Sequence, residues 1–129
     1  MIVDSSALLA VLFGEDDADR FARALAAARD RRMSAVNWFE AAINADRRGD
    51  PSVLGLFDDL CQRIGIGVEP VTAEHARLAR AAHAAFGKGR HKAGLNLGDC
   101  FAYALAKATG EPLLFKGDDF AATDVTPAL

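Results

Sequence analysis

The chain opens with a two-residue apolar segment, Ile2-Val3, that passes directly into the polar triplet Asp4-Ser5-Ser6. An apolar helix pattern follows from Ala7 to Phe13, and Gly14 stands where that helix would end. Asp and Ser are preferred at the N-cap of a helix, and Gly is preferred just after its end. The first residues therefore predict a short buried strand followed at once by a helix.

The same alternation continues along the chain. Three further strands are predicted at residues 31–34, 66–71 and 113–115. The helical patterns between them carry apolar stripes, which are Phe21, Leu25 and Ala28; Val36, Phe39 and Ile43; Leu54, Phe57, Cys61 and Ile64; and, in a helix from about 98 to 109, Phe101, Leu105 and Ala108. An alanine-rich helix is expected from about 73 to 86. Strands alternating with helices indicate an α/β fold with a short, mostly parallel sheet between helical layers.

Length and composition agree with one globular domain over residues 1–129. The two cysteines, Cys61 and Cys100, match no zinc or redox spacing, and we interpret them as buried apolar side chains. No signal segment is apparent, and no apolar run approaches the ~20 residues that span a bilayer. We therefore expect a cytoplasmic protein without membrane contact.

Carboxylates occur where the solubility of the chain does not require them. In an open parallel sheet the site lies at the carboxyl ends of the strands, which here carry Asp4 after the first strand and Asp118-Asp119 after the last. Glu40 shares a helix face with apolar residues, and Asp99 lies in the first turn of its helix. Each acid also has a simpler interpretation: an N-cap, a solvated turn, an exposed or Arg47-paired side chain, or a first-turn acid favoured by the helix dipole.

Gathered at one edge of the sheet, these acids would repel one another unless a cation lay among them. Oxygen ligands without His or Cys select Mg²⁺ or Mn²⁺, and such a site can activate water for displacement at phosphorus. A glycine-rich basic loop with Lys88, Arg90 and Lys92 precedes Asp99 and could bind phosphates.

Four blocks of the sequence together resemble the PIN-domain ribonuclease toxins of the VapC type. They are Met1-Ile-Val-Asp-Ser-Ser-Ala-Leu-Leu9, Met33-Ser-Ala-Val-Asn-Trp-Phe-Glu40, Gly89-Arg-His-Lys-Ala-Gly-Leu-Asn-Leu-Gly-Asp-Cys-Phe-Ala-Tyr103 and Leu113-Leu-Phe-Lys-Gly-Asp-Asp-Phe120. The resemblance covers almost the whole chain, and the third block is the most specific.

This resemblance implies a PIN-like three-layer fold and a metal-dependent endoribonuclease that is inhibited by a small VapB-like antitoxin. It also implies a homodimer, and a hetero-oligomer with the antitoxin. Carried over by position, Asp4 and Asp99 would ligate the divalent ion, Glu40 would bind it directly or through water, and Ser6 would be a polar partner behind the ligands. Many relatives read Thr-x-Asp-x-Asp-Phe in the closing block, whereas here Gly117 occupies the place of the usual acid. Asp118 is therefore the preferred fourth acid, with Asp119 as the alternative.

Three other functions share features with this sequence. A phosphatase of the haloacid-dehalogenase type needs a second Asp two positions after the first, where this chain has Ser6. A metal-free ribonuclease needs two histidines at one phosphate, and His75, His83 and His91 give no reason to expect this. A PIN-like module that binds RNA or a partner without cutting it is the main alternative.

The net charge of −3 does not exclude a nucleic-acid partner, because the charge is unevenly distributed. Residues 75–98 hold five basic residues and no acid, whereas the rest of the chain holds all 18 acids. The chain therefore combines a local basic segment with an acidic remainder.

Overall fold

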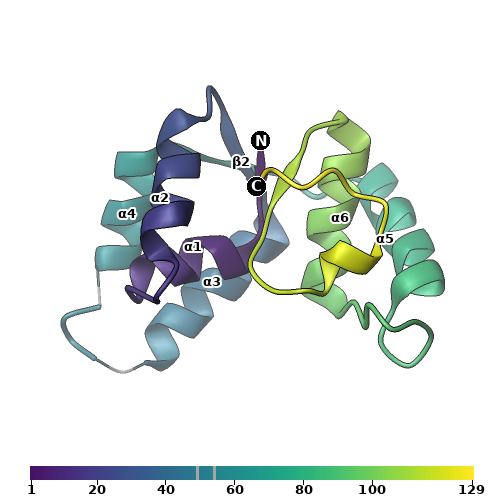
Figure 1. The fold of residues 1–129 in the computed structure, drawn as a ribbon, viewed down its shortest axis with the longest axis horizontal. Helices are drawn as coiled ribbons and strands as arrows, with labels where there is room; N and C mark the ends of the chain where they lie inside the picture. Colours follow the sequence, from purple (N-terminus) through teal and green to yellow (C-terminus); the bar gives the residue numbers. More distant parts are fainter. Residues whose placement is uncertain (49, 54) are drawn as a thin grey trace.

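The computed structural model describes residues 1–48, 50–53 and 55–129 (Figure 1). Within these residues the strands are β1 (Ile2–Val3), β2 (Arg31–Ser34), β3 (Ile66–Glu69) and β4 (Leu113–Leu114). The helices are α1 (Ser5–Leu12), α2 (Ala18–Ala27), α3 (Ala35–Arg47), α4 (Leu56–Ile64), α5 (Ala73–Phe86) and α6 (Leu97–Thr109), and a short 3-10 helix, η1, covers Phe120–Ala122. None of the helices in these ranges is long and apolar enough to cross a membrane.

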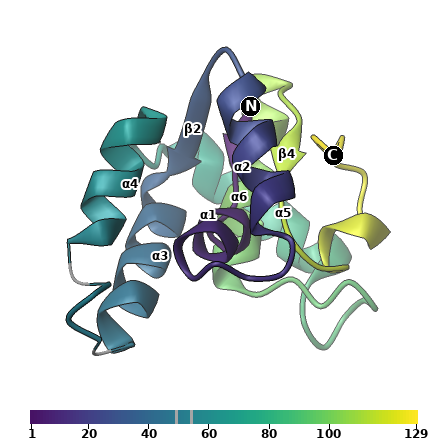
Figure 2. The same ribbon diagram turned by 60° about the vertical axis from the view of Figure 1, so that its left-hand side comes forward.

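The strands form one parallel sheet in the order β3-β2-β1-β4, which confirms the predicted α/β class. Alternate residues of a strand point to opposite faces, and here they enter separate cores. Val3 and Leu114 pack with helices α1 to α4, whereas Ile2 and Leu113 pack with α5 and α6. Figures 1 and 2 show these two helical layers on either side of the sheet.

An ion-pair network crosses the sheet. Arg32 on β2 pairs with Glu69 of β3 at 3.3 Å and also with Glu111, just before β4. Glu111 accepts a hydrogen bond from the N-terminal amine of Met1 at 2.7 Å. The network links all four strands, and its Met1–Glu111 part lies at the amino ends of β1 and β4, opposite to Asp4.

Helix caps agree with the sequence prediction at several ends. The side chain of Asp4 caps α1, Ser34 caps α3 and Thr72 caps α5. The predicted boundaries of α5 are those observed, and α1 begins at Ser5 rather than Ala7. Leu54, which we placed on the apolar stripe of α4, lies outside the described residues.

The predicted apolar face of α3 is wrong. The buried residues are Asn37, Ala41 and Ala45, whereas Phe39 is 61% exposed. The helix lies against α1 and α6, and small side chains at four-residue spacing let these helices approach closely. The larger apolar side chains therefore turn away from this contact, and Glu40 is partly exposed rather than held within an apolar stripe.

Candidate acidic active site

Asp4 lies at the carboxyl end of β1 and is 3% exposed. Its Oδ2 accepts hydrogen bonds from the Ser6 backbone N–H at 3.0 Å and from the Ser6 hydroxyl at 2.6 Å. Its other oxygen, Oδ1, is buried and has no hydrogen-bond partner among the residues that the structure describes. One carboxylate oxygen is thus fixed by the helix cap and the other has no partner.

The surroundings of Asp4 disfavour its charge. Burial raises its pKa to about 6, the hydrogen bonds from Ser6 act in the opposite direction, and the nearby charge of Glu40 raises the pKa further. A carboxyl group with such a pKa gains from any cation that approaches its free oxygen.

Glu40 reaches the same edge from α3. Its Oε1 accepts a hydrogen bond from the Ser5 hydroxyl, and among the described residues it forms no ion pair with Arg47 or any other base. The carboxylate lies directly over Gly98, so that a Cβ at this position would overlap it. Asn37, one turn earlier on α3, is fully buried and donates to the Gly98 carbonyl at 2.9 Å.

Asp99 is held at the start of α6 by a capping box. Its Oδ2 accepts from the Asn96 backbone N–H at 3.0 Å, and the Asn96 side chain accepts from the Asp99 N–H at 2.9 Å. Burial raises the pKa of Asp99 to about 7 against the opposing effect of the cap, and the charges of Asp4, Asp119 and Glu40 raise it as well. We call these four residues, Asp4, Glu40, Asp99 and Asp119, the acidic edge.

The two candidates for the fourth acid have different surroundings. Asp118 and Asp119 are both exposed in the turn after β4. The charge of Asp119 acts on Asp99, whereas Asp118 lines a separate hollow beside Lys116. Asp119 is therefore the candidate whose charge reaches Asp99, and Asp118 stays the candidate nearer in sequence to the usual acid.

The acidic edge suits a hard divalent cation by its chemistry. It offers only oxygen ligands, one buried oxygen lacks a partner, and two of its acids have raised pKa values. In the part of the chain that the structure describes, no three His, Cys, Asp or Glu side chains are already grouped to hold a metal ion. The charges of these acids therefore act on one another, although the described side chains do not surround a metal position on all sides.

The basic loop is ordered by its backbone. Gly87 pairs with Leu95, Lys88 N–H donates to the Leu95 carbonyl at 2.9 Å, and His91 Nδ1 accepts from the Ala93 N–H at 3.1 Å. The three predicted RNA-binding residues, Lys88, Arg90 and Lys92, are exposed on this loop.

The histidines do not form a catalytic pair in this arrangement. The His91 ring packs edge-on against Phe86, with 5.3 Å between the ring centroids, while His75 and His83 lie near opposite ends of α5. His91 therefore contributes to the order of the loop through its contacts with Ala93 and Phe86.

Three residues that surround the acids were missed in the sequence. Ser5 was treated only as a capping residue, although its hydroxyl contacts Glu40. Gly98 and Asn37 join the two helices that carry Glu40 and Asp99. A buried polar residue three positions before Glu40 is a usable signal for Asn37, but only the packing of α3 against α6 identifies Gly98.

The sequence of this chain is similar to those of known PIN domain proteins. The PIN domain family matches residues 1–125. The chain is 52% identical to Ribonuclease VapC28 of Mycobacterium tuberculosis, over 100% of this chain and 98% of that protein. It is 48% identical to Ribonuclease VapC42 of the same organism, over 99% and 98%.

Two solved structures share the fold. The crystal structure of M. tuberculosis VapC20, described as a sarcin-ricin loop cleaving toxin, aligns with a TM-score of 0.78 and 17% identity over 97% of this chain and 95% of that one. A chain of a toxin-antitoxin complex from Klebsiella pneumoniae aligns with a TM-score of 0.69 and 16% identity over 95% and 92%. At these identities the likeness concerns the fold.

Proposed function

The chain belongs to the PIN domain family and, within it, to the VapC ribonucleases, and from this membership we propose that it is the endoribonuclease toxin of a toxin–antitoxin pair. The observation that carries the chemistry is the pair of buried carboxyl groups, Asp4 and Asp99, whose pKa values are raised toward neutrality at one edge of a parallel sheet. Buried acids that resist ionisation at a strand edge are typical of functional sites.

Asp4 and Asp99 would hold a Mg²⁺ ion, with Mn²⁺ as a substitute, and Glu40 would bind it directly or through water. The bound ion would supply a water of lowered pKa and offset negative charge at the phosphate. Ser6 orients Asp4 through two hydrogen bonds, and Ser5 keeps the Glu40 carboxylate over Gly98. The exposed cations of the basic loop would bind phosphates along the strand.

The test is cleavage of candidate RNAs by the wild-type protein with and without EDTA, beside an Asp4→Asn variant. Both treatments are expected to lower kcat/KM by about 10³-fold or more, roughly 4 kcal/mol in the barrier. Asp16→Asn, which changes an exposed acid before α2, is the matched control and should retain activity. Cleavage that survives both EDTA and Asp4→Asn would exclude this mechanism. Binding of RNA without cleavage by the wild type would favour the non-catalytic module.

The partners follow from the same family. We propose that the toxin works in the cytoplasm, forms a homodimer, and is inhibited in a hetero-oligomer with a small VapB-like antitoxin; a toxin–antitoxin complex among its structural neighbours supports this. Light scattering of the toxin alone and co-purified with its antitoxin measures both assemblies. A monomeric toxin, or RNA cleavage unaffected by the antitoxin, would contradict the corresponding part of the proposal.

A further inference from the structure

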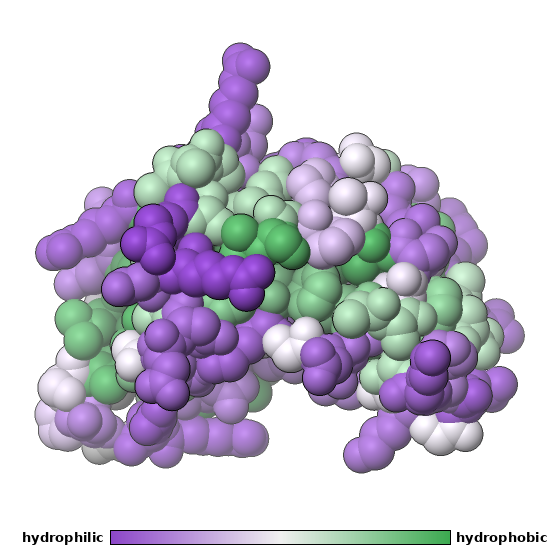
Figure 3. Space-filling model, viewed as in Figure 1, coloured by the Kyte–Doolittle hydropathy of each residue, from purple (hydrophilic) through white to green (hydrophobic). Residues whose placement is uncertain are grey.

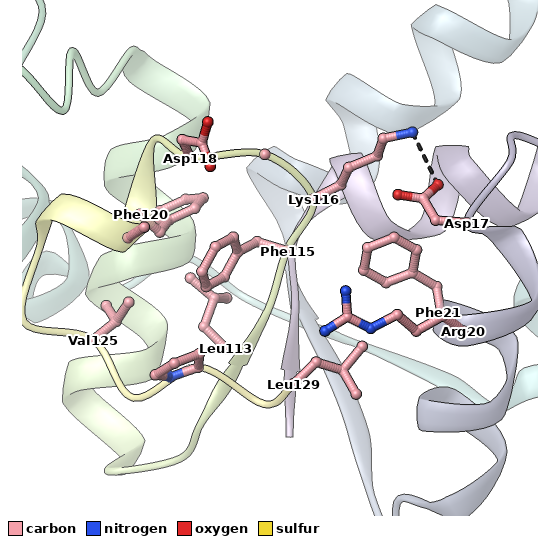
Figure 4. A pocket seen from close by; sticks show the side chains of 13 residues that line it. Asp17, Arg20, Phe21, Leu113, Phe115, Lys116, Asp118, Phe120, Val125 and Leu129 are labelled. Carbon is pink, nitrogen blue, oxygen red and sulfur yellow. Dashed lines mark hydrogen bonds and ion pairs between the residues drawn. The ribbon is translucent and has the colours of Figure 1, made fainter.

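A hollow of about 480 Å³ lies between α2, the segment that follows β4 and the C-terminal residues (Figure 4). Charged side chains line part of it, and the apolar part of its wall is formed by Phe21, Phe115, Phe120, Val125 and Leu129. Figure 3 shows apolar residues across the middle of this face, with hydrophilic side chains around them. We call it the Arg20 hollow, after the cation at its entrance.

The hollow presents an aromatic surface. Phe115 directly follows β4 and is half-buried, and its ring packs on that of Phe120 with 5.1 Å between centroids. Because Phe120 is 2% exposed, it supports Phe115 from behind. A flat ligand could therefore stack on the Phe115 ring without displacing the core.

The two cations at the entrance, Arg20 and Lys116, differ in whether they form ion pairs. Lys116 is already paired with Asp17 at 2.9 Å and with Glu15. Arg20 is exposed, and within the described residues its guanidinium has no ion-pair partner. In Figure 4 this guanidinium points into the hollow between Phe21 and Leu129. The unpaired positive charge therefore belongs to Arg20, and it faces the apolar wall.

The hollow adjoins the acidic edge through a short chain of hydrogen bonds. The Lys116 N–H donates to the Ser6 hydroxyl at 3.0 Å, and that hydroxyl donates to Asp4 at 2.6 Å. Asp119 lies in the turn between Lys116 and Phe120. The wall of the hollow is thus connected to Asp4 through Ser6, and it shares the segment after β4 with Asp119.

We infer that the Arg20 hollow binds one unpaired nucleotide of the RNA substrate, next to the phosphodiester that is cut at the acidic edge. The base stacks on Phe115, and Arg20 contacts a phosphate of the same strand. Stacking on aromatic side chains combined with a cation is how proteins bind single-stranded nucleic acid. The inference rests on the proposed ribonuclease function and adds to it the place where the base beside the cut is bound.

The experiment measures the affinity of fluorescein-labelled RNA hexamers of A, C, G or U for the Asp4→Asn protein in EDTA, by fluorescence anisotropy. Arg20→Ala and Phe115→Leu are each expected to weaken the best-bound hexamer by roughly 10-fold. Arg20→Ala should also reduce, by about 1, the slope of the logarithm of the binding constant against the logarithm of the salt concentration. Arg23→Ala, an exposed arginine on the same helix and outside the hollow, should change affinity less than about twofold. Phe115→Trp, which retains the aromatic face, should restore it.

Unchanged hexamer affinity in Arg20→Ala and in a folded Phe115→Leu would overturn the inference. It would also be overturned if these variants retained RNA affinity and lost only the antitoxin, because the hollow would then be a protein-binding site. RNA cleavage by the wild type separates the nucleotide subsite from the proposed function. If the wild type cleaves RNA and neither Arg20→Ala nor Phe115→Leu changes RNA affinity, only the nucleotide subsite is rejected. Failure of the wild type to cleave rejects the proposed function.

Discussion

Asp4 loses water on folding and gains only the two donors of Ser6, both at one of its oxygens. A buried carboxylate with an unpartnered oxygen is costly to ionise. Asp99 is in a similar position, since its capping bonds only partly offset burial and three neighbouring charges. At the scale of single residues, the site is therefore two acids that are stable when protonated and ready to accept a cation.

The first prediction concerns pH and stability in the presence of EDTA. An exposed Asp has a pKa of 3.8, whereas the pKa values of Asp4 and Asp99 in the folded protein are raised to about 6 and about 7. Between these values the folded state binds more protons than the unfolded state, so the free energy of unfolding falls by several kcal/mol as pH rises from about 4 to 8.

Urea denaturation across this pH range measures the effect. In Asp4→Asn the free energy of unfolding should depend less on pH, because the amide of Asn does not titrate. A slope identical in the wild type and in Asp4→Asn would show that Asp4 is not the titrating group.

The second prediction separates the two acids of the closing turn. Asp119→Asn should lower the pKa of Asp99, since the Asp119 charge helps to raise it, whereas Asp118→Asn should leave that pKa nearly unchanged. Carbon NMR titration of the Asp99 carboxyl measures the pKa directly. A larger decrease in Asp118→Asn would restore Asp118 as the fourth acid.

At the scale of elements, the junction of α3 with α6 decides where two of the acids lie. Asn37 holds the Gly98 carbonyl, and the absence of a side chain at Gly98 leaves room for the Glu40 carboxylate. Glu40 and Asp99, 59 positions apart in the chain, thereby come within electrostatic range of each other.

The third prediction tests this junction. The methyl group of Gly98→Ala would overlap the end of the flexible Glu40 side chain, which moves aside. We expect a change in stability within about 1 kcal/mol, because Ala also favours the helix. Activity should nevertheless fall about as far as in Glu40→Gln.

Gly67→Ala is the matched control, since Gly67 in β3 has ordinary space around it. A Gly98→Ala protein with full activity would show that the position of Glu40 over Gly98 is not needed for catalysis.

At the scale of the whole molecule, the acids that follow β1, lie on α3 and α6 and stand in the turn after β4 meet at the carboxyl edge, and an ion-pair network links the four strands. A cation that binds these acids binds only the folded state and should stabilise it. Binding strengthens with pH, because the ligands must be deprotonated.

The fourth prediction follows from this coupling. Mg²⁺ or Mn²⁺ at millimolar concentration should raise the Tm by several degrees at pH 8 and by clearly less at pH 5.5. A thermal-shift assay measures both, with Asp4→Asn as the variant expected to lose the effect. An equal increase in Asp4→Asn would place the ion elsewhere on the protein.

Much of the fold follows from local patterns. The strand at Ile2-Val3, the cap at Asp4 and the helix from Ala73 to Phe86 could be predicted because cap chemistry and short-range periodicity determine them. The exposed Phe39 was mispredicted because several faces of α3 are apolar in sequence. Which face is buried depends on the helices that pack against it.

The sequence by itself determined the α/β class and the places of the four strands, and it marked Asp4, Glu40 and Asp99 as candidate site residues, since each leaves a signal within a few residues of itself. Only the tertiary structure decided that Asp119 rather than Asp118 acts on Asp99, that Gly98 makes room for Glu40, and that Arg20 faces an aromatic hollow. These relations join residues from different elements, and their distances are set by how helices pack on the sheet. No local pattern encodes such distances, because the same residues in another packing would not meet.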